Sequence, residues 1–285
     1  MTLPPFELHR PHSLEEATEL AARYGEDAAF YCGGTELLLL LKLGFAAFGH
    51  LADLKGIEEL RGVRAENGTL VVGAAVTHRE LERSAVVHER LPALARMERG
   101  VANLRVREVG TLGGNLCFSD PHSDPATFLL AVDAEVECRR GGGLPRRLQI
   151  ADFVVGPYQT SLEQGELLTA VHVPPAPEGA SVAHAKFSFH ERPTATVACL
   201  ARVVDGVVAE ARVAVGSVGV RPVRSRAAAE ALTGAPVDEL DHVLSNAGER
   251  AAEDAAPVDD ATGSADYKSQ LVKVLVERTF REALA

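Results

Sequence analysis

Cys32-Gly33-Gly34-Thr35-Glu36-Leu37 is the first of two glycine-rich loops in this chain, and Thr111-Leu112-Gly113-Gly114-Asn115 is the second. Paired glycines carry no side chains, so their backbone N–H groups can approach an anion closely and can adopt positive φ angles. The first loop runs into a leucine-rich segment, and a helix beginning there would add its partial positive charge. Neither loop has the glycine spacing of a Rossmann fold or a P-loop. Together the loops predict a site that grips the two phosphates of a dinucleotide.

The composition is typical of a globular protein that does not bind nucleic acid. The chain has 285 residues, of which 46% are hydrophobic, and its formal net charge of −11 would repel a polyanion. No apolar run approaches the roughly 18 residues of a membrane span. The N-terminal segment lacks the charged and apolar regions of a signal peptide, so we expect a cytoplasmic location. The four cysteines lie far apart without a Cys-x-x-Cys pair, which argues against a zinc or iron–sulfur ligand cluster.

Hydrophobic periodicity and turn residues divide the chain into two parts. The first part alternates strands and helices: strands are expected at 28–32, 51–54, 70–73 and 135–138, and helices after capping boxes at Ser13 and Thr77 and at 128–132. A proline-rich stretch, 174–179, marks the boundary. In the second part, Asp205-Gly206 predicts a hairpin between runs 195–204 and 207–215, and helices are expected at 224–232, 237–255 and 267–283. The pattern predicts an α+β nucleotide-binding region followed by a domain of antiparallel strands and helices.

Polar residues outside the glycine loops could contribute to the site. Asp124 could accept hydrogen bonds from a ribose hydroxyl or an adenine amine, although its place before Pro125 also suits a helix N-cap. Lys186 is expected on a strand, where it could face a phosphate or a flavin edge, or simply lie in solvent. His122 lies near Asp120 and Asp124, but three such residues on one loop are more typical of a polar loop than of a metal site.

In the order and spacing of its motifs, the chain resembles one family of flavoproteins. The motifs are the two glycine loops and Ala52-Asp53-Leu54-Lys55-Gly56-Ile57, Val72-Gly73-Ala74-Ala75-Val76-Thr77-His78, Arg107-Glu108-Val109-Gly110, Ser123-Asp124, Gly165-Glu166-Leu167-Leu168-Thr169, Lys186-Phe187, Ala211-Arg212-Val213-Ala214-Val215-Gly216 and Ser264-Ala265-Asp266-Tyr267-Lys268. Over essentially the whole chain they resemble the FAD-binding medium subunit of the molybdenum hydroxylases, the family of xanthine dehydrogenase and aerobic carbon monoxide dehydrogenase.

The resemblance implies a fold and a set of cofactor contacts. It implies a two-subdomain FAD-binding fold of the vanillyl-alcohol-oxidase (PCMH) type, with subdomains at about 1–56 and 57–175, and a C-terminal α+β domain at 176–285. The residues implied to contact FAD are Tyr31, Cys32, Gly33, Gly34, Thr35, Glu36, Leu37, Thr111, Gly113, Gly114, Asn115, Asp124, Leu168 and Lys186. Asp124 would bind the adenosine half, Leu168 would contact adenine through its backbone, and Lys186 would lie near the flavin.

The chain also departs from some members of the family. Thr35-Glu36 stands where some relatives have His-Ser, so we expect FAD to be non-covalent. The extra cysteines of the iron–sulfur-bearing variant are absent from the sequence, so no cluster is expected here. The residue that stacks on the flavin ring stays open among Phe187, Phe189 and Thr194.

The function implied by the resemblance is an electron relay. A large subunit would oxidise substrate at molybdopterin, and a small subunit would pass electrons through two [2Fe–2S] clusters to FAD on this chain, in a dimer of heterotrimers. NAD, a quinone or oxygen would accept them. No side chain of this chain is expected to be catalytic or to bind a metal. Two alternatives are a freestanding FAD-dependent oxidase or reductase and a non-catalytic nucleotide-binding assembly subunit.

Overall fold

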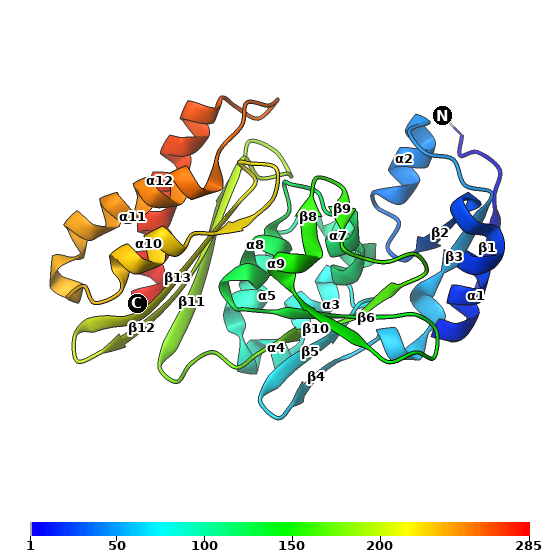
Figure 1. Cartoon of the computed structure of the whole chain (residues 1–285), viewed down its shortest axis with the longest axis horizontal. Helices are drawn as coiled ribbons and strands as arrows, with labels where there is room; N and C mark the ends of the chain where they lie inside the picture. The colour runs from blue at the N-terminus through cyan, green and yellow to red at the C-terminus, as the bar shows by residue number, and fades with distance from the viewer. Residues whose placement is uncertain (1) are drawn as a thin grey trace.

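The computed structural model describes residues 2 to 285, which form three lobes in a row (Figure 1). The first lobe is a small parallel sheet with two helices, in the order β1 (Glu7–His9), α1 (Leu14–Tyr24), β2 (Ala28–Tyr31), α2 (Leu37–Leu43) and β3 (His50–Asp53). Strand β3 is central, because it pairs in parallel with both β1 and β2. The Ser13 hydroxyl caps α1, but the expected capping box is incomplete because the Glu16 carboxylate accepts the His12 N–H instead.

The second lobe is a five-stranded antiparallel sheet with short helices. Its strands are β4 (Val63–Glu66), β5 (Thr69–Gly73), β6 (Glu135–Arg139), β7 (Arg146–Gln149) and β10 (Leu167–Val173), in the spatial order β4-β5-β10-β6-β7, and β8 (Val154–Gly156) pairs separately with β9 (Gln159–Thr160). Its helices are α3 (His78–Arg83), α4 (Ala85–Arg90), α5 (Pro92–Arg99), α6 (Leu104–Val109), α7 (Leu112–Phe118), α8 (Asp124–Ala131) and α9 (Ile150–Phe153). The capping box predicted at Thr77 is confirmed, with Glu80 as its partner.

The third lobe is a four-stranded antiparallel sheet covered by three helices. The strands run in spatial order β11 (Ala180–Phe187), β12 (Ala195–Val204), β13 (Val207–Gly216) and β14 (Val223–Arg224), and the helices are α10 (Arg226–Leu232), α11 (Leu240–Ala255) and α12 (Ala265–Leu284). The predicted hairpin is confirmed, with Asp205 and Gly206 at φ of 51° and 76°. The helix expected from Arg224 begins later because Arg224 pairs with β13 and Ser225 caps α10.

Helix α8 is buried between the second and third lobes. All eight residues of this helix are buried, and it contacts β12 and β13 of the third lobe as well as α5 of the second. The third sheet is buried on both faces, because Leu200 belongs to the core shared with the second lobe and Cys199 to the core beneath the C-terminal helices. A helix whose residues are all apolar except Asp124 and Thr127 suits such a position. These observations confirm the predicted α+β architecture, with a separate antiparallel sheet in the C-terminal lobe.

Candidate functional site

A cavity of about 350 Å³ lies where the first two lobes meet, and residues 191 to 193 of the third lobe contribute to its lining. Its volume falls within the range of small-molecule sites, which is about 300–1,000 Å³. Twelve of the fourteen residues implied to contact FAD line it, namely Cys32, Gly33, Gly34, Thr35, Glu36, Leu37, Thr111, Gly113, Gly114, Asn115, Asp124 and Leu168. Tyr31 and Lys186 lie outside the lining. The fold therefore gathers segments more than 100 residues apart around one cavity.

The first glycine loop offers unpaired amide groups to this cavity. In the described chain, the N–H groups of residues 34 to 37 donate no hydrogen bond to a protein acceptor. Gly34 has a φ of +71°, and a Cβ there would lie 2.3 Å from the Tyr31 ring, so only glycine fits. Neighbouring amides that face a cavity without protein acceptors can hold an anion such as a phosphate.

The two glycine loops contact each other through their backbones. A Cβ on Gly33 would lie 2.4 Å from the carbonyl oxygen of Val109 and 2.7 Å from Cα of Gly110. The Cys32 side chain is hydrogen-bonded to Thr111, and burial raises the pKa of the Cys32 thiol. The pairing of the two loops in one site, expected from the sequence, thus depends on Gly33 having no side chain.

The second glycine stretch differs from the expectation, because it forms the first turn of α7 rather than a loop. Thr111 is the N-cap, and its hydroxyl accepts the Gly114 N–H. The Gly113 N–H donates to Ala74, and a Cβ on Gly113 would lie 2.6 Å from that residue's carbonyl oxygen. The amides of Leu112 and Asn115 are also bonded within the protein. The expectation of free amides therefore holds for the first loop but, in the second stretch, only for Thr111, whereas Gly113 permits a close approach between α7 and the turn that follows β5.

Asp124 and Lys186 form a buried ion pair at the N-terminal end of α8. Asp124 is 4% exposed, so it lies in the first turn as a buried charge, with Ser123 in the N-cap position. Lys186 donates from Nζ to Asp124 Oδ2 at 2.7 Å and to the Gly100 carbonyl oxygen at 2.6 Å. The other carboxylate oxygen, Oδ1, is buried without a hydrogen-bond partner. His184 lies 3.6 Å from it, and burial lowers the pKa of that imidazole.

The ion pair between Asp124 and Lys186 affects the roles that the two residues can have in binding a ligand. An unsatisfied buried acceptor is costly, and the nearest recorded donor group to Oδ1 is the His184 imidazole on β11. Lys186 Nζ and Asp124 Oδ2 are in contact, and of the two residues only Asp124 lines the cavity. The side chain of Asp124 would make the direct contact, and Lys186 would fix its charge and orientation.

The mouth of the cavity carries an ion-pair bridge that the sequence analysis missed. Arg192 lies 3.1 Å from Glu36 of the first loop and 2.9 Å from Asp120, which follows α7. The backbone N–H of His122 donates to Asp120 Oδ1 at 2.9 Å, but its imidazole contacts the Pro193 carbonyl oxygen at 2.9 Å and Asp260 at 3.3 Å. The side chains of Asp120, His122 and Asp124 therefore point to different partners, which agrees with the expected polar loop. Only tertiary structure brings Arg192 to this site, because residues 188 to 193 carry no recognisable motif.

Comparison with known proteins identifies related sequences over the whole chain. The family model described as "FAD binding domain in molybdopterin dehydrogenase" matches residues 4–176, and "CO dehydrogenase flavoprotein C-terminal domain" matches residues 184–283. The carbon monoxide dehydrogenase medium chain of Hydrogenophaga pseudoflava is 34% identical over 100% of this chain and 99% of its own length. A putative xanthine dehydrogenase FAD-binding subunit of Escherichia coli K12 is 32% identical, covering 97% and 95% respectively.

Solved structures agree with these sequence matches. The structure of Hydrogenophaga pseudoflava carbon monoxide dehydrogenase lacking the Mo-pyranopterin moiety contains a chain with a TM-score of 0.95 and 34% identity, over 100% of this chain and 99% of that one. Quinoline 2-oxidoreductase from Pseudomonas putida 86 gives a TM-score of 0.93 and 29% identity, over 99% and 98%. Within residues 2–285, every helix is too short or too polar to cross a bilayer.

Proposed function

Because this chain belongs to the family of FAD-binding medium subunits of molybdenum hydroxylases, we propose that it is the electron-transfer subunit of such a complex. It would hold FAD between the [2Fe–2S] clusters of a small partner subunit and a final acceptor that is NAD, a quinone or oxygen. A large partner subunit would hold molybdopterin and oxidise the substrate, in a dimer of heterotrimers. The observation that carries this proposal is the cavity, whose lining combines amides without protein acceptors, close glycine contacts and the carboxylate residue Asp124.

Different residues of the cavity would bind different parts of FAD. The free amides of residues 34 to 37 would bind the pyrophosphate, and Gly114 lets the Thr111 hydroxyl cap α7 at close range, since a Cβ there would lie 2.8 Å from Thr111 Oγ1. Asp124 Oδ1 would accept a hydrogen bond from a ribose hydroxyl or an adenine amine, and Leu168 would contact the cofactor from β10. Bound FAD supplies the redox chemistry, so the protein needs no general acid or base of its own.

The cavity favours non-covalent binding. Neither glycine loop contains a histidine, and the two histidines in the lining already have partners within the protein. The Nδ1 atom of His78 lies 2.7 Å from Glu98, a fully buried carboxylate, and His122 contacts Pro193.

The first test is the absorption spectrum of the purified chain and of its complex, before and after acid precipitation. We expect oxidised-flavin bands that remain in the supernatant, with one flavin per chain, and bleaching when the complete complex receives its substrate under anaerobic conditions. Flavin retained in the pellet would contradict non-covalent binding. Substrate turnover by the chain alone would favour a freestanding oxidase or reductase. A chain that takes up no added FAD, even within the complex, would instead be an assembly subunit.

A further inference from the structure

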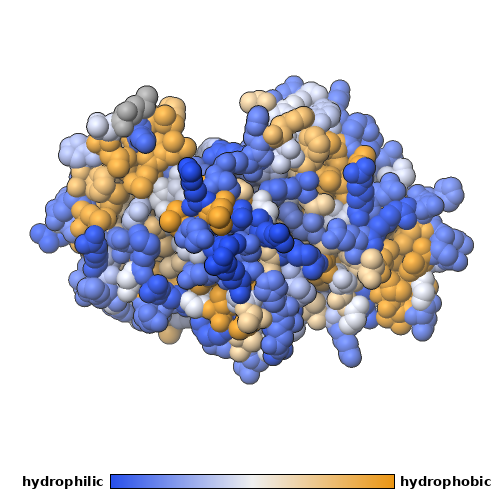
Figure 2. Space-filling model, turned by 180° about the vertical axis from the view of Figure 1, so that it is seen from behind, coloured by the Kyte–Doolittle hydropathy of each residue, from blue (hydrophilic) through white to orange (hydrophobic). Residues whose placement is uncertain are grey.

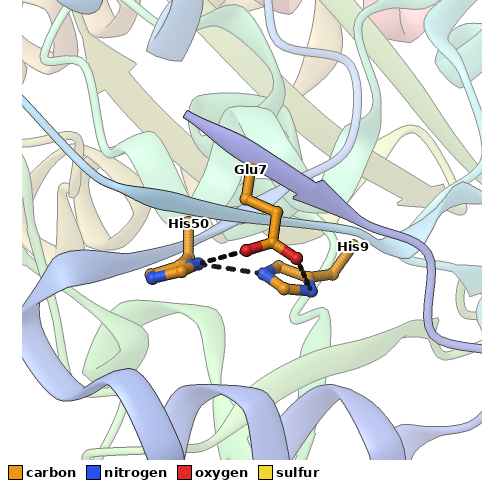
Figure 3. Close-up of side chains that lie close together, drawn as sticks. All are labelled: Glu7, His9 and His50. Carbon is orange, nitrogen blue, oxygen red and sulfur yellow. Dashed lines mark hydrogen bonds and ion pairs between the residues drawn. The ribbon is translucent and has the colours of Figure 1, made fainter. Parts of the chain in front are cut away.

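The parallel pairing in the first lobe brings two histidines and a glutamate together. Glu7 and His9 are two residues apart on β1, so their side chains leave the strand on the same face. The register places Glu7 opposite His50, the first residue of β3. Figure 3 shows the three side chains converging on that face of the sheet. Within residues 2–285, this is the one group of three potential metal-ligating side chains whose ligand atoms all lie within 4.8 Å of one another.

The distances between the ligand atoms suit one small cation. His9 Nε2 lies 3.0 Å from His50 Nδ1, and Glu7 Oε2 lies 3.6 Å from the same nitrogen. Two nitrogen ligands bonded to Zn²⁺ at about 2.1 Å in tetrahedral geometry are roughly 3.4 Å apart. The two imidazoles would therefore have to separate by only a few tenths of an ångström to admit a metal ion between them.

The two imidazoles can replace the hydrogen bond between them with bonds to a metal ion by changing which nitrogen carries a proton. Without a metal, one of the facing nitrogens must carry the hydrogen that joins His9 to His50. With a metal, that proton would move to the other nitrogen of the same ring. For His50 this is Nε2, which points away from the group in Figure 3, and for His9 it is Nδ1, 3.8 Å from Glu7 Oε1. Both rings would then bind as neutral ligands.

The surroundings hold the imidazoles in place and leave the carboxylate accessible. The His9 and His50 side chains are 15% and 21% exposed, whereas that of Glu7 is 66% exposed. Tyr24, the last residue of α1, stacks on His50 with ring centroids 3.6 Å apart and on His9 at 5.4 Å. A ring stacked on both imidazoles restricts their rotation, and the exposed carboxylate gives a metal ion a route from solvent.

We propose that Glu7, His9 and His50 form a binding site for a transition-metal ion of the zinc class. Two imidazole nitrogens and one carboxylate favour zinc, copper or nickel over magnesium and calcium, which prefer oxygen ligands. The ion ties the edge strand β1 to the central strand β3, so its role is structural. None of the three residues lines the flavin cavity, and the proposal is independent of the proposed redox function.

The test uses the metal-stripped full-length chain, freed of any affinity tag, titrated with Zn²⁺ by calorimetry. We expect one Zn²⁺ per chain and a higher melting temperature, because an ion that binds only the folded state stabilises it. His9→Ala and His50→Ala should abolish both effects, and Glu7→Gln should weaken binding because it replaces the carboxylate ligand with a neutral amide. His242→Ala is the matched control, since His242 is exposed on α11, and it should bind as the wild type does. Undiminished binding in His9→Ala, or no binding in the wild type, would overturn the proposal.

A second readout covers the case in which a histidine variant fails to fold. Cu²⁺ bound to the wild-type chain should show hyperfine coupling to two imidazole nitrogens in its electron paramagnetic resonance spectrum. A copper spectrum without nitrogen coupling would refute the site. The flavin content of the wild-type chain should not change with added Zn²⁺, so a failure here is distinguishable from a failure of FAD binding.

Discussion

A carboxylate buried as deeply as Asp124 needs a cation, and Lys186 supplies it although the two lie 62 positions apart in the chain. Asp124→Asn keeps the shape of the side chain but removes its charge, which leaves Lys186 without its anion. Since hydrogen bonds to charged groups contribute about 1.5–3 kcal/mol, we expect the free energy of unfolding to fall by that amount. The variant should also bind FAD roughly tenfold more weakly, because its amide N–H₂ disfavours a ligand donor at this position.

Urea denaturation and FAD titration by flavin fluorescence measure the two effects. Asp152→Asn, at an exposed position of α9, serves as the control and should change neither quantity. Loss of stability with unchanged FAD affinity would mean that Asp124 supports the fold and does not contact the cofactor.

The sequence predicts some residues of the flavin cavity, but it does not predict the contact between Asp124 and Lys186 or the group of Glu7, His9 and His50. Asp124 stands next to the second glycine stretch, so its place at the cavity could be inferred from its local context and from the resemblance. Its partner Lys186 was selected by resemblance, but the contact between them depends on how β11 packs on α8. The cluster of Glu7 with His50 was not predicted at all, because it depends on a parallel register between strands 41 residues apart. No local pattern encodes such a register.

At the scale of elements, the sequence predicted helices and hairpins best where local chemistry and tertiary packing agree. The Asp205-Gly206 hairpin and the Thr77 capping box are set by residues close in the chain, and both formed as predicted. Helix α7 was missed because Gly113 and Gly114 are poor helix formers. Its first turn forms because Thr111 caps it and because β5 is followed by a segment whose carbonyl groups accept its amides. Tertiary contacts therefore override propensity where the cavity is built.

The long helix α12 is anchored by an ion pair whose strength depends on pH. Lys268 in its first turn is fully buried, and its Nζ lies 2.6 Å from Asp260 Oδ2. Burial acts to raise the pKa of Asp260, but hydrogen bonds from Lys268 and Thr262 outweigh it and lower the pKa to about 2, from an ordinary value of 3.8. Because the folded pKa is the lower one, the stabilisation is complete above about pH 4 and is lost as the pH falls toward 2.

Asp260→Asn should therefore be less stable than the wild type by roughly 1 kcal/mol at pH 7, since solvent screens this exposed carboxylate, and the difference should shrink as the pH falls below 4. Urea unfolding at a series of pH values measures it, down to the lowest pH at which both proteins fold. Asp266→Asn removes a neighbouring exposed carboxylate and should keep a small, constant difference. A difference for Asp260→Asn that stays the same across this range would show that the pair does not titrate as described.

At the scale of the whole molecule, apolar side chains gather on the lobe that holds the N-terminus (Figure 2). Leu39 and Leu43 lie four residues apart on one face of α2 and are 44% and 47% exposed, and Phe45 just beyond the helix is 77% exposed. Helix α2 begins at Leu37, which lines the flavin cavity. In the proposed complex, FAD would exchange electrons with a cluster on another chain, and an apolar face beside the cofactor is suited to contact that chain. We therefore expect the small [2Fe–2S] subunit to dock on this face.

Phe45→Ser tests this expectation, because it removes the most exposed aromatic ring of the face without touching the core. The isolated chain should keep its melting temperature and its flavin content. Its affinity for the small subunit should fall by about thirtyfold or more, as is typical when a central aromatic residue is lost from an interface.

Leu144→Ser is the matched control: Leu144 is 94% exposed, but it lies in the turn between β6 and β7, away from α2, so its loss should not affect assembly. Equal assembly of wild type and Phe45→Ser, measured by gel filtration of the mixed subunits, would place the docking surface elsewhere. Weaker assembly by Leu144→Ser as well would show only that exposed apolar area in general promotes association.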